Sequence, residues 1–162
     1  MKIVVLKFGG TSVGTIEKIK KVTDIIIEHK KKKNKVIVVS SAMSGVTNDL
    51  IKKSKQISNN FIDSEYDVLV SSGEQVACSL IAGRLNHKGF KSRSWLGWQI
   101  PIFTNGPYTN SRIQQVNKNK LLRFLKEGGI PIITGFQGVN MNERVTTIGR
   151  GGSDASAIMI AK

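Results

Sequence analysis

The sequence is poor in the residues that form disulfide scaffolds and zinc sites. Its 162 residues include a single cysteine, Cys78, and two histidines, His29 and His87. One cysteine cannot form a disulfide within the chain, and thiols without partners are typical of reducing compartments. Because the histidines lie far from the cysteine and from each other, we expect no metal site. We therefore predict a cytoplasmic protein stabilised by its hydrophobic core.

Long hydrophobic runs are also missing. No apolar run approaches the ~20 residues that a membrane-spanning helix requires. The apolar start of the chain, residues 1–7, is too short for a secretion signal and is more typical of a buried strand. The hydrophobic fraction of 40% is that of a soluble globular protein. The length predicts one domain with a core of its own and no membrane partner.

Acidic residues are scarce, with 11 against 25 basic ones, which leaves a net charge of +14. Such an excess can indicate a nucleic-acid-binding surface. Much of it, however, lies in the run at residues 30–35, at the end of a predicted helix, where the helix dipole favours cations. We interpret this run as a solvated face and do not expect a nucleic-acid partner, although a basic nucleic-acid-binding module remains an alternative function.

Apolar runs typical of strands alternate along the chain with patterns typical of helices. Strands are predicted at 2–7, 36–39, 91–95, 99–104, 112–116 and 130–134, and a hairpin at 137–148. Helices are predicted at 15–33, 47–57, 118–127 and after 154, with a helical region that ends at His87 and is broken or kinked around residues 71–73. This alternation predicts an α/β fold, a three-layer αβα sandwich around a mainly parallel sheet.

Small polar residues follow four of the predicted strands, at 7–12, 40–48, 134–138 and 149–154. In parallel sheets, ligands bind beyond the carboxyl ends of the strands. We therefore expect these four segments to form one site at one edge of the sheet.

The segment at 149–154 combines three glycines with Arg150, Ser153 and Asp154. An arginine can hold a carboxylate or phosphate through two parallel hydrogen bonds. Ser153 or Asp154 can cap the helix that follows. The alternative is an ordinary glycine-rich turn before a helix.

The segment at 7–12 has the properties of a phosphate-binding loop, although the common Walker A and dinucleotide motifs are absent. Gly9 and Gly10 free the backbone to approach anionic oxygens, Ser12 adds a hydroxyl, and Lys7 adds a charge at the strand end. Phosphoryl transfer depends mainly on positioning and charge neutralisation, which such a loop supplies. The alternative for Lys7 is an ordinary lysine at the end of a strand.

Five blocks of this sequence, in order, resemble the motifs of aspartate kinases, within the amino acid kinase superfamily. They are residues 7–12 (KFGGTS), 41–48 (SAMSGVTN), 72–74 (SGE), 135–138 (GFQG) and 146–154 (TTIGRGGSD). The resemblance implies the amino acid kinase fold and the ATP-dependent phosphorylation of the L-aspartate side chain to 4-phospho-L-aspartate. That reaction leads to lysine or diaminopimelate, threonine and methionine. ATP with Mg²⁺ would be the co-substrate.

The resemblance also implies roles for individual residues. Lys7 would stabilise the transferring phosphoryl group, and Asp154 would complete the catalytic site. The phosphates would lie near Lys7, Gly9, Gly10 and Ser12. L-Aspartate would be bound by Ser41, Thr47, Glu74, Arg150 and Ser153, with Glu74 on its ammonium and Arg150 on a carboxylate.

Structural alternatives exist for three of these residues. Glu74, in the first turn after the predicted helix break, can complement a helix N-terminus, and Asp154 can act only as a cap. Thr47 can be an N-cap as well as a ligand. An alternative function is that of another amino acid kinase, of the glutamate, acetylglutamate or uridylate type, because those kinases also have the glycine pair found here at Gly9 and Gly10.

Family members continue beyond the last of these blocks into a nucleotide-binding half and regulatory ACT domains. On this resemblance we expect residues 1–162 to correspond to the N-terminal, amino-acid-binding part of one kinase domain, incomplete at its C-terminus and without an ACT domain. We expect weak nucleotide binding by this part alone and an exposed sheet edge or face. We also expect a homo-oligomer or a pairing with a chain that carries the nucleotide half. A truncated, inactive form and a non-catalytic subunit are the alternatives.

Overall fold

The computed structural model describes residues 2–162. Its elements are β1 (Ile3–Phe8), α1 (Ile16–Lys31), β2 (Lys35–Ser40), α2 (Val46–Ile57), α3 (Asp63–His87), β3 (Ser92–Trp95), β4 (Ile102–Asn105), β5 (Arg112–Val116), α4 (Asn119–Lys126), β6 (Ile130–Thr134), β7 (Gln137–Val139), β8 (Val145–Thr147) and α5 (Gly152–Ala161). None of its helices is both long and apolar enough to cross a membrane.

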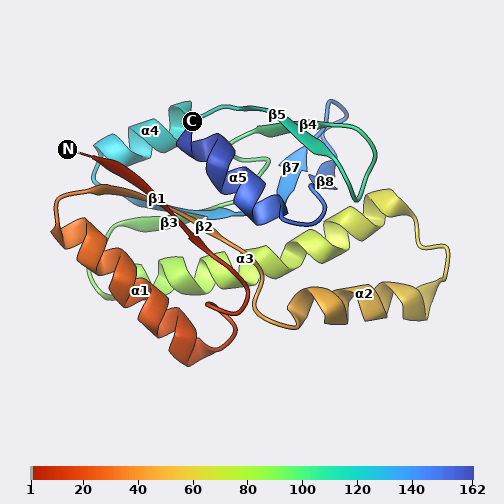
Figure 1. Ribbon diagram of the computed structural model, residues 1–162, viewed down its shortest axis with the longest axis horizontal. Coiled ribbons are helices and arrows are strands. Elements are labelled where there is room, and N and C mark those ends of the chain that lie inside the picture. Colours follow the sequence, from red (N-terminus) through yellow and green to blue (C-terminus); the bar gives the residue numbers. More distant parts are fainter. Residues whose placement is uncertain (1) are drawn as a thin grey trace.

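A parallel sheet of order β1-β2-β6-β3 forms the centre of the molecule (Figure 1). Side chains along β2 alternate between two hydrophobic clusters, as the period of a strand requires. Val36 and Val38 pack with residues of α1 and α3 on one face. Ile37 and Val39 pack with residues of α4 and α5 on the other. The predicted three-layer αβα arrangement is therefore confirmed.

The remaining strands form a separate sheet of order β5-β4-β7-β8, in which β4 pairs antiparallel with β5 and β7 with β8. The β7–β8 hairpin confirms the one predicted at 137–148. The strand predicted at 99–104 begins only at Ile102, because the residues before it form a turn. In that turn the Gln99 side chain accepts a hydrogen bond from the Leu96 amide, and the Gln99 amide donates to the Leu96 carbonyl.

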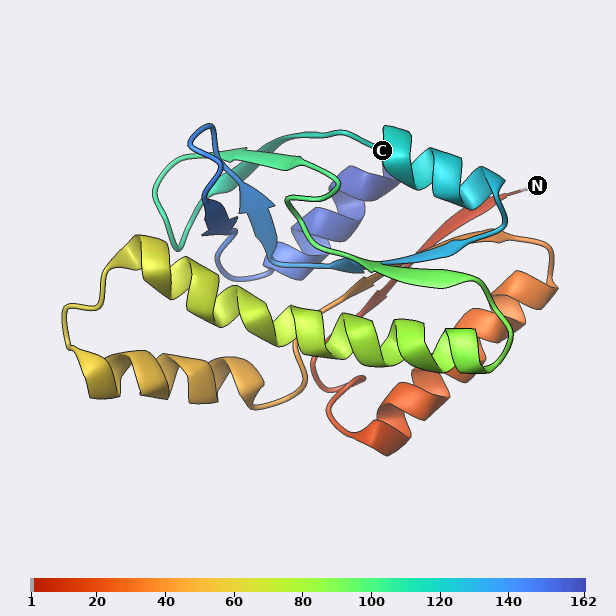
Figure 2. The same ribbon diagram turned by 180° about the vertical axis from the view of Figure 1, so that it is seen from behind.

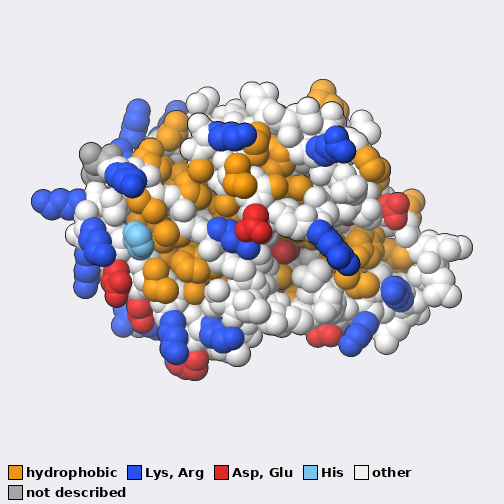
Figure 3. All heavy atoms as spheres, viewed as in Figure 1, with side chains coloured by type: hydrophobic (Ala, Val, Ile, Leu, Met, Phe, Trp, Pro, Cys, Tyr) orange, Lys and Arg blue, Asp and Glu red, His pale blue; other side chains and the backbone are white. Residues whose placement is uncertain are grey.

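The sheet has an uncovered edge at β1, where Ile3 is 46% exposed. A groove of about 430 Å³ lies over β1 and β2, between α4 and the end of α5, and is lined mainly by apolar side chains, among them Ile3, Val5, Leu121, Leu122 and Ile160. Figure 3 shows hydrophobic side chains gathered on the same side of the molecule, among spaced lysines and arginines. The expectation of an exposed edge is therefore confirmed.

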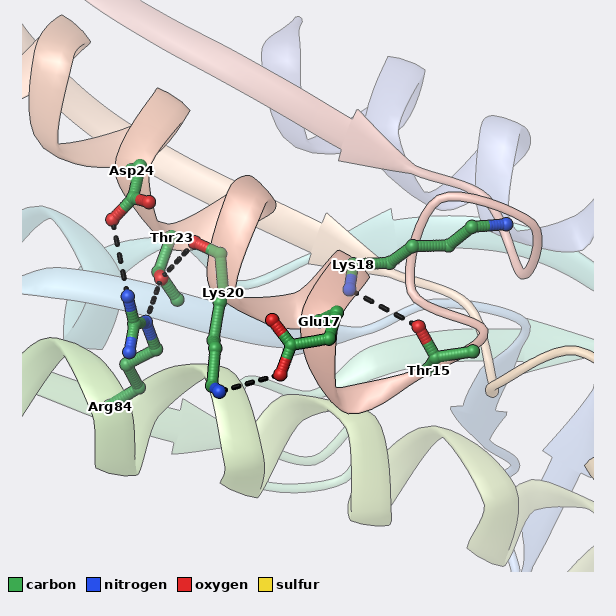
Figure 4. A network of polar contacts seen from close by, with 7 residues as sticks. All are labelled: Thr15, Glu17, Lys18, Lys20, Thr23, Asp24 and Arg84. Atoms are coloured by element: carbon green, nitrogen blue, oxygen red, sulfur yellow. Dashed lines mark hydrogen bonds and ion pairs between the residues drawn. The ribbon is translucent and has the colours of Figure 1, made fainter.

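Polar contacts tie α1 to α3 on the opposite face of the sheet (Figure 4). Arg84 of α3 donates to the Thr23 hydroxyl at 2.6 Å and pairs with Asp24 at 3.4 Å, both on α1. Thr15 caps α1 by accepting a hydrogen bond from the Lys18 amide. The contacts of Arg84 therefore hold α1, the helix that follows the 7–12 segment, against α3, the longest helix of the fold.

The helix α3 is continuous through residues 71–73, so the predicted break is wrong. The Ser71 and Ser72 hydroxyls donate to the carbonyls of Val68 and Leu69 within the helix, which keeps them compatible with it. A Cβ at Gly73 would lie 2.9 Å from the Ala42 Cβ, so this glycine permits close packing against the segment after β2. Figure 2 shows the consequence, with α2 packed along the first half of α3.

The predicted caps of two helices are also wrong. Gly151 is the N-cap of α5, so neither Ser153 nor Asp154 caps it. Gly45 is the N-cap of α2, so Thr47 does not have that role. Both glycines have a left-handed backbone conformation, with φ of 74° at Gly151 and 85° at Gly45, which residues other than glycine rarely adopt. The sharp turn into each helix therefore depends on glycine. The side chains of Thr47, Ser153 and Asp154 do not cap these helices and can make other contacts.

Candidate active site

A cavity of about 350 Å³ lies at the carboxyl ends of β1, β2 and β6. It is lined by Lys7, Ser41, Ala42, Thr47, Glu74, Phe136 and residues 149–154. Every residue predicted for catalysis or substrate binding is among them. The expectation that the four polar segments meet at one edge of the sheet is confirmed.

A larger cavity, of about 580 Å³, lies elsewhere, between β3 and α4. Its lining includes Arg93, Trp95, Trp98 and Arg123 and none of the predicted site residues. Trp95 packs edge-on against Phe124 and carries the Arg93 guanidinium over its ring. We therefore place the candidate active site in the smaller cavity, where the strand ends converge.

Lys7 and Asp154 form an ion pair at the cavity, with the Lys7 Nζ 2.8 Å from the Asp154 Oδ1. Lys7 lies at the end of β1, and Asp154 lies in the first turn of α5. The lysine side chain is 28% exposed and that of Asp154 63%. A pair this open to solvent adds little stability. Its effect is to hold the ammonium group at the mouth of the cavity.

Gly9 lies beside this ammonium group, and the cavity is lined by neither glycine of the pair. A Cβ on Gly9 would lie 3.5 Å from the Lys7 Nζ, and one on Gly10 would lie 3.0 Å from the Ala42 carbonyl oxygen. Gly10 thus lets the segment after β1 pack closely against the segment after β2. Ser12 is exposed, and its amide closes a tight turn by donating to the Gly9 carbonyl at 2.9 Å. Phosphate binding by this loop stays a prediction.

Glu74 is a buried carboxylate with one oxygen unused. Its side chain lies in the middle of α3, so the alternative that it complements a helix N-terminus is wrong. The residue is only 3% exposed, and its Oε1 accepts a hydrogen bond from the Ala42 amide at 3.2 Å. Its Oε2 is buried and has no hydrogen-bond partner in residues 2–162. Burial raises the pKa of Glu74 to about 7, against the weaker opposing effect of backbone hydrogen bonds. Such an oxygen is suited to receive a cationic ligand.

Arg150 is exposed and lies between two glycines with left-handed φ, Gly149 at 71° and Gly151 at 74°. Within residues 2–162 its guanidinium forms no ion pair, so it is available to an anion. Ser153 is buried. It packs closely against Gly135, where an added Cβ would lie 2.6 Å from the Ser153 hydroxyl oxygen. The cavity thus combines a free guanidinium, a lysine and a buried carboxylate.

Two contributors were not predicted from the sequence. The Ala42 amide holds Glu74, a role that no side-chain pattern can reveal. Asp67 is fully buried and accepts hydrogen bonds from Thr109 and Thr147. The helical period could have found Asp67, because it lies seven residues before Glu74 and therefore on the same buried side of α3.

No cluster of three or more histidine, cysteine or acidic side chains in residues 2–162 could hold a metal ion. Cys78 is buried, and burial raises the pKa of its thiol far above the usual range. It therefore offers neither a metal ligand nor a nucleophile.

The comparisons with known proteins agree on one family. A sequence profile described as the amino acid kinase family matches residues 2–162. The chain is 47% identical over 161 residues to an aspartokinase of Geobacillus stearothermophilus and 42% identical to an aspartate kinase of Pseudomonas putida. These matches cover 99% of the chain but only 40% and 39% of the relatives, so the chain spans about two fifths of their length.

Solved structures give the same result. A crystal structure of an aspartate kinase from Synechocystis is 37% identical, with a TM-score of 0.82, over 99% of this chain and 26% of that one. E. coli aspartokinase III, crystallised in complex with aspartate and ADP, has a TM-score of 0.85 over 99% of this chain and 46% of that one. At 24% identity this second likeness concerns the fold.

Proposed function

The chain belongs to the amino acid kinase family, and on that premise we propose that residues 1–162 form the amino-acid-binding part of an aspartate kinase. The proposed reaction is the ATP-dependent phosphorylation of the side-chain carboxylate of L-aspartate. The curated relatives named above support this substrate, and they are about two and a half times as long as the chain. The proposed kinase activity is therefore that of a longer enzyme of which this chain forms one part.

The observation that carries the proposal is the pair of opposite groups in one cavity. Glu74 presents a buried oxygen without a partner, and Arg150 presents a guanidinium without an ion pair in the described residues. An amino acid needs an anion for its ammonium group and a cation for its carboxylate, at a fixed separation. We assign Glu74 to the ammonium and Arg150 to a carboxylate, with Ser41, Thr47 and Ser153 completing the substrate site.

The proposed chemistry needs no general base. An oxygen of the ionised aspartate side chain forms a bond to the γ-phosphorus while the bond from that phosphorus to the β–γ bridging oxygen breaks. ADP leaves, and no proton has to move. Lys7 would neutralise charge on the transferring group, and Asp154, 2.8 Å from its ammonium, would hold it in place.

The nucleotide would reach this site as its magnesium complex. We propose that its phosphates lie near Lys7, Gly9, Gly10 and Ser12, which stand at the end of β1 and in the turn after it. A Cβ on Gly9 would lie 3.5 Å from the Lys7 Nζ. Mg²⁺ would be held largely by the phosphates themselves, and we assign it no residue of this chain.

The proposal extends to the partners of the chain. The apolar groove over β1 and β2, lined by Ile3, Val5, Leu121, Leu122 and Ile160, supports packing against the part of the enzyme that carries the nucleotide half. We propose that this half is covalently continuous or a separate chain, that the enzyme is a homo-oligomer, and that it is cytoplasmic. Its product would enter the synthesis of lysine or diaminopimelate, threonine and methionine.

The test uses a chimera of this chain with the part of the Geobacillus relative that follows the matched segment. We expect the chimera to form aspartyl hydroxamate from hydroxylamine only when ATP and L-aspartate are both present. Lys7→Met should lower the rate at least about a hundredfold, because it removes charge stabilisation of the transferring group. Lys2→Met, just before the start of the same strand, is the matched control and should keep the rate. Equal turnover with L-glutamate, or full activity in Lys7→Met, would contradict the proposal.

A further inference from the structure

The helix α3 carries a second buried carboxylate, Asp67, which does not line the cavity. Asp67 is 0% exposed and lies seven residues, or about two helical turns, before Glu74. The two side chains therefore belong to the same buried side of one helix. The proposed reaction gives Asp67 no direct role.

Asp67 holds two segments that lie far from it in the sequence. The Thr109 amide donates to both of its oxygens, at 3.0 Å each. The Thr147 amide donates to its Oδ2 at 2.8 Å, and the Thr147 hydroxyl donates to its Oδ1 at 2.7 Å. Hydrogen bonds to an ionised acceptor are stronger than those between neutral groups. Burial raises the pKa of Asp67, and these hydrogen bonds oppose that rise.

The contacts of Asp67 fix the base of the turn that carries Arg150. Thr147 is the last residue of β8, three residues before Arg150. The glycines on both sides of Arg150 allow many backbone conformations, so the turn depends on its surroundings for a fixed position. Those surroundings include the segment held through Thr109, because the Ser111 amide donates to the Thr147 carbonyl at 2.9 Å and Gly149 packs against Asn110.

We propose that Asp67 is a positioning residue that fixes the Arg150 turn relative to Glu74. One rigid helix then sets the spacing between the anion and the cation of the substrate site. Through Glu74 the helix places the group for the ammonium, and through Asp67 and Thr147 it places the group for the carboxylate. The identity of the ligand, L-aspartate, rests on the proposed function; the positioning itself rests on the contacts above.

The test combines amide hydrogen exchange with aspartate binding in Asp67→Asn. The amides of Ile148, Gly152 and Asp154 are all hydrogen-bonded, to Phe136, Gly149 and Gly151 respectively, and so report on the turn. We expect their exchange to accelerate at least about tenfold while the buried β6 amides keep their protection, because the lost hydrogen bonds lie at the turn. The Kd for L-aspartate should rise about tenfold or more.

Two further variants keep the test decisive. Thr147→Val removes only the hydroxyl bond, so we expect the same pattern with a smaller change and with the fold retained. Asp63→Asn, at the exposed start of the same helix, is the matched control and should change neither exchange nor affinity.

Faster exchange that is equal in the turn and in β6 would overturn the proposal, since it would mean general destabilisation alone. Wild-type behaviour of Asp67→Asn in both measurements would also overturn it. If the turn loosens selectively but the wild-type chain binds no aspartate, the positioning role stands and the proposed substrate fails.

Discussion

At the scale of single residues, Glu74 determines how the site responds to pH. Its pKa of about 7 means that the empty site holds this carboxyl mostly protonated at pH 6. A substrate ammonium beside Oε2 favours the ionised form and lowers that pKa. Binding of aspartate should therefore expel a proton.

We expect the binding of L-aspartate at pH 6 to release about one proton, and at pH 8.5 almost none. Titration calorimetry in two buffers of different ionisation enthalpy measures this number. The Glu74→Gln variant should release no proton at either pH. Proton release in that variant equal to that in the wild type would show that another group titrates.

Glu74 should also make stability depend on pH in the absence of any ligand. The folded chain keeps a proton that the unfolded chain loses above pH 4.5, so the contribution of Glu74 to stability is complete below pH 4.5. It is lost as the pH rises to about 7. The upper bound of this loss is on the order of 3 kcal/mol.

Urea unfolding at pH 4.5 and pH 8 measures this effect. The wild type should lose stability relative to Glu74→Gln between the two values, because the glutamine does not titrate. Glu28→Gln, on the exposed side of α1, is the control and should follow the wild type. A constant difference between the wild type and Glu74→Gln at both pH values would contradict the assigned pKa.

At the scale of elements, α3 organises both the fold and the site. It packs on the sheet, supports α2, and carries Asp67 and Glu74. Gly73 lies in the centre of α3. A Cβ added to it would lie 2.9 Å from the Ala42 Cβ and 3.2 Å from the Val46 side chain. This glycine therefore sets how closely the 41–46 segment, and with it Ser41, approaches the helix.

Two glycines of α3 give a matched pair of substitutions. Gly83→Ala meets no atom within 4 Å and should stabilise the protein by about 0.5–1 kcal/mol, the helix preference of alanine over glycine. Gly73→Ala has the same preference but clashes with Ala42 and Val46, so we expect net destabilisation of about 1–3 kcal/mol. Chemical denaturation measures both, and a stabilising Gly73→Ala would show that the packing at Ala42 is loose.

The same helix shows where sequence reasoning succeeds and where it fails. The apolar runs of β1, β2 and β6 predict the parallel sheet, and the polar segments at 7–12 and 149–154 predict the place of Lys7 and Arg150. The place of Glu74 is implied only by the resemblance to aspartate kinases. The Ser71-Ser72-Gly73 run indicates a break or a kink, yet the helix continues through it. Local propensity does not reveal that Gly73 serves a tertiary contact. The same limit applies to the cap of α5, where a left-handed Gly151 replaces the expected side-chain cap. The hydrogen bonds of Asp67 link residues 80 positions apart, which no local pattern encodes.

At the scale of the whole molecule, the site and the apolar groove lie at different places on the central sheet. The cavity lies where the strands end, and the groove lies over β1 and β2. The chain has a net charge of +14, and the face in Figure 3 shows lysines and arginines spaced apart from one another. On the proposed function, Lys7 and Arg150 are the cations that act on ligands, and both lie at the cavity.

The most direct test of the account is calorimetric titration of the chain at pH 8 with L-aspartate and with succinate, which has the same two carboxylates but no ammonium group. We expect saturable binding of L-aspartate at one site, and a Kd for succinate at least about tenfold higher, because the buried Glu74 carboxylate then has no cation. Arg150→Ala should weaken the binding of both ligands, whereas Arg112→Ala should not. Binding of succinate as tight as that of L-aspartate, or no binding of L-aspartate at all, would contradict the assignment of Glu74 and Arg150 as the two ends of an aspartate site.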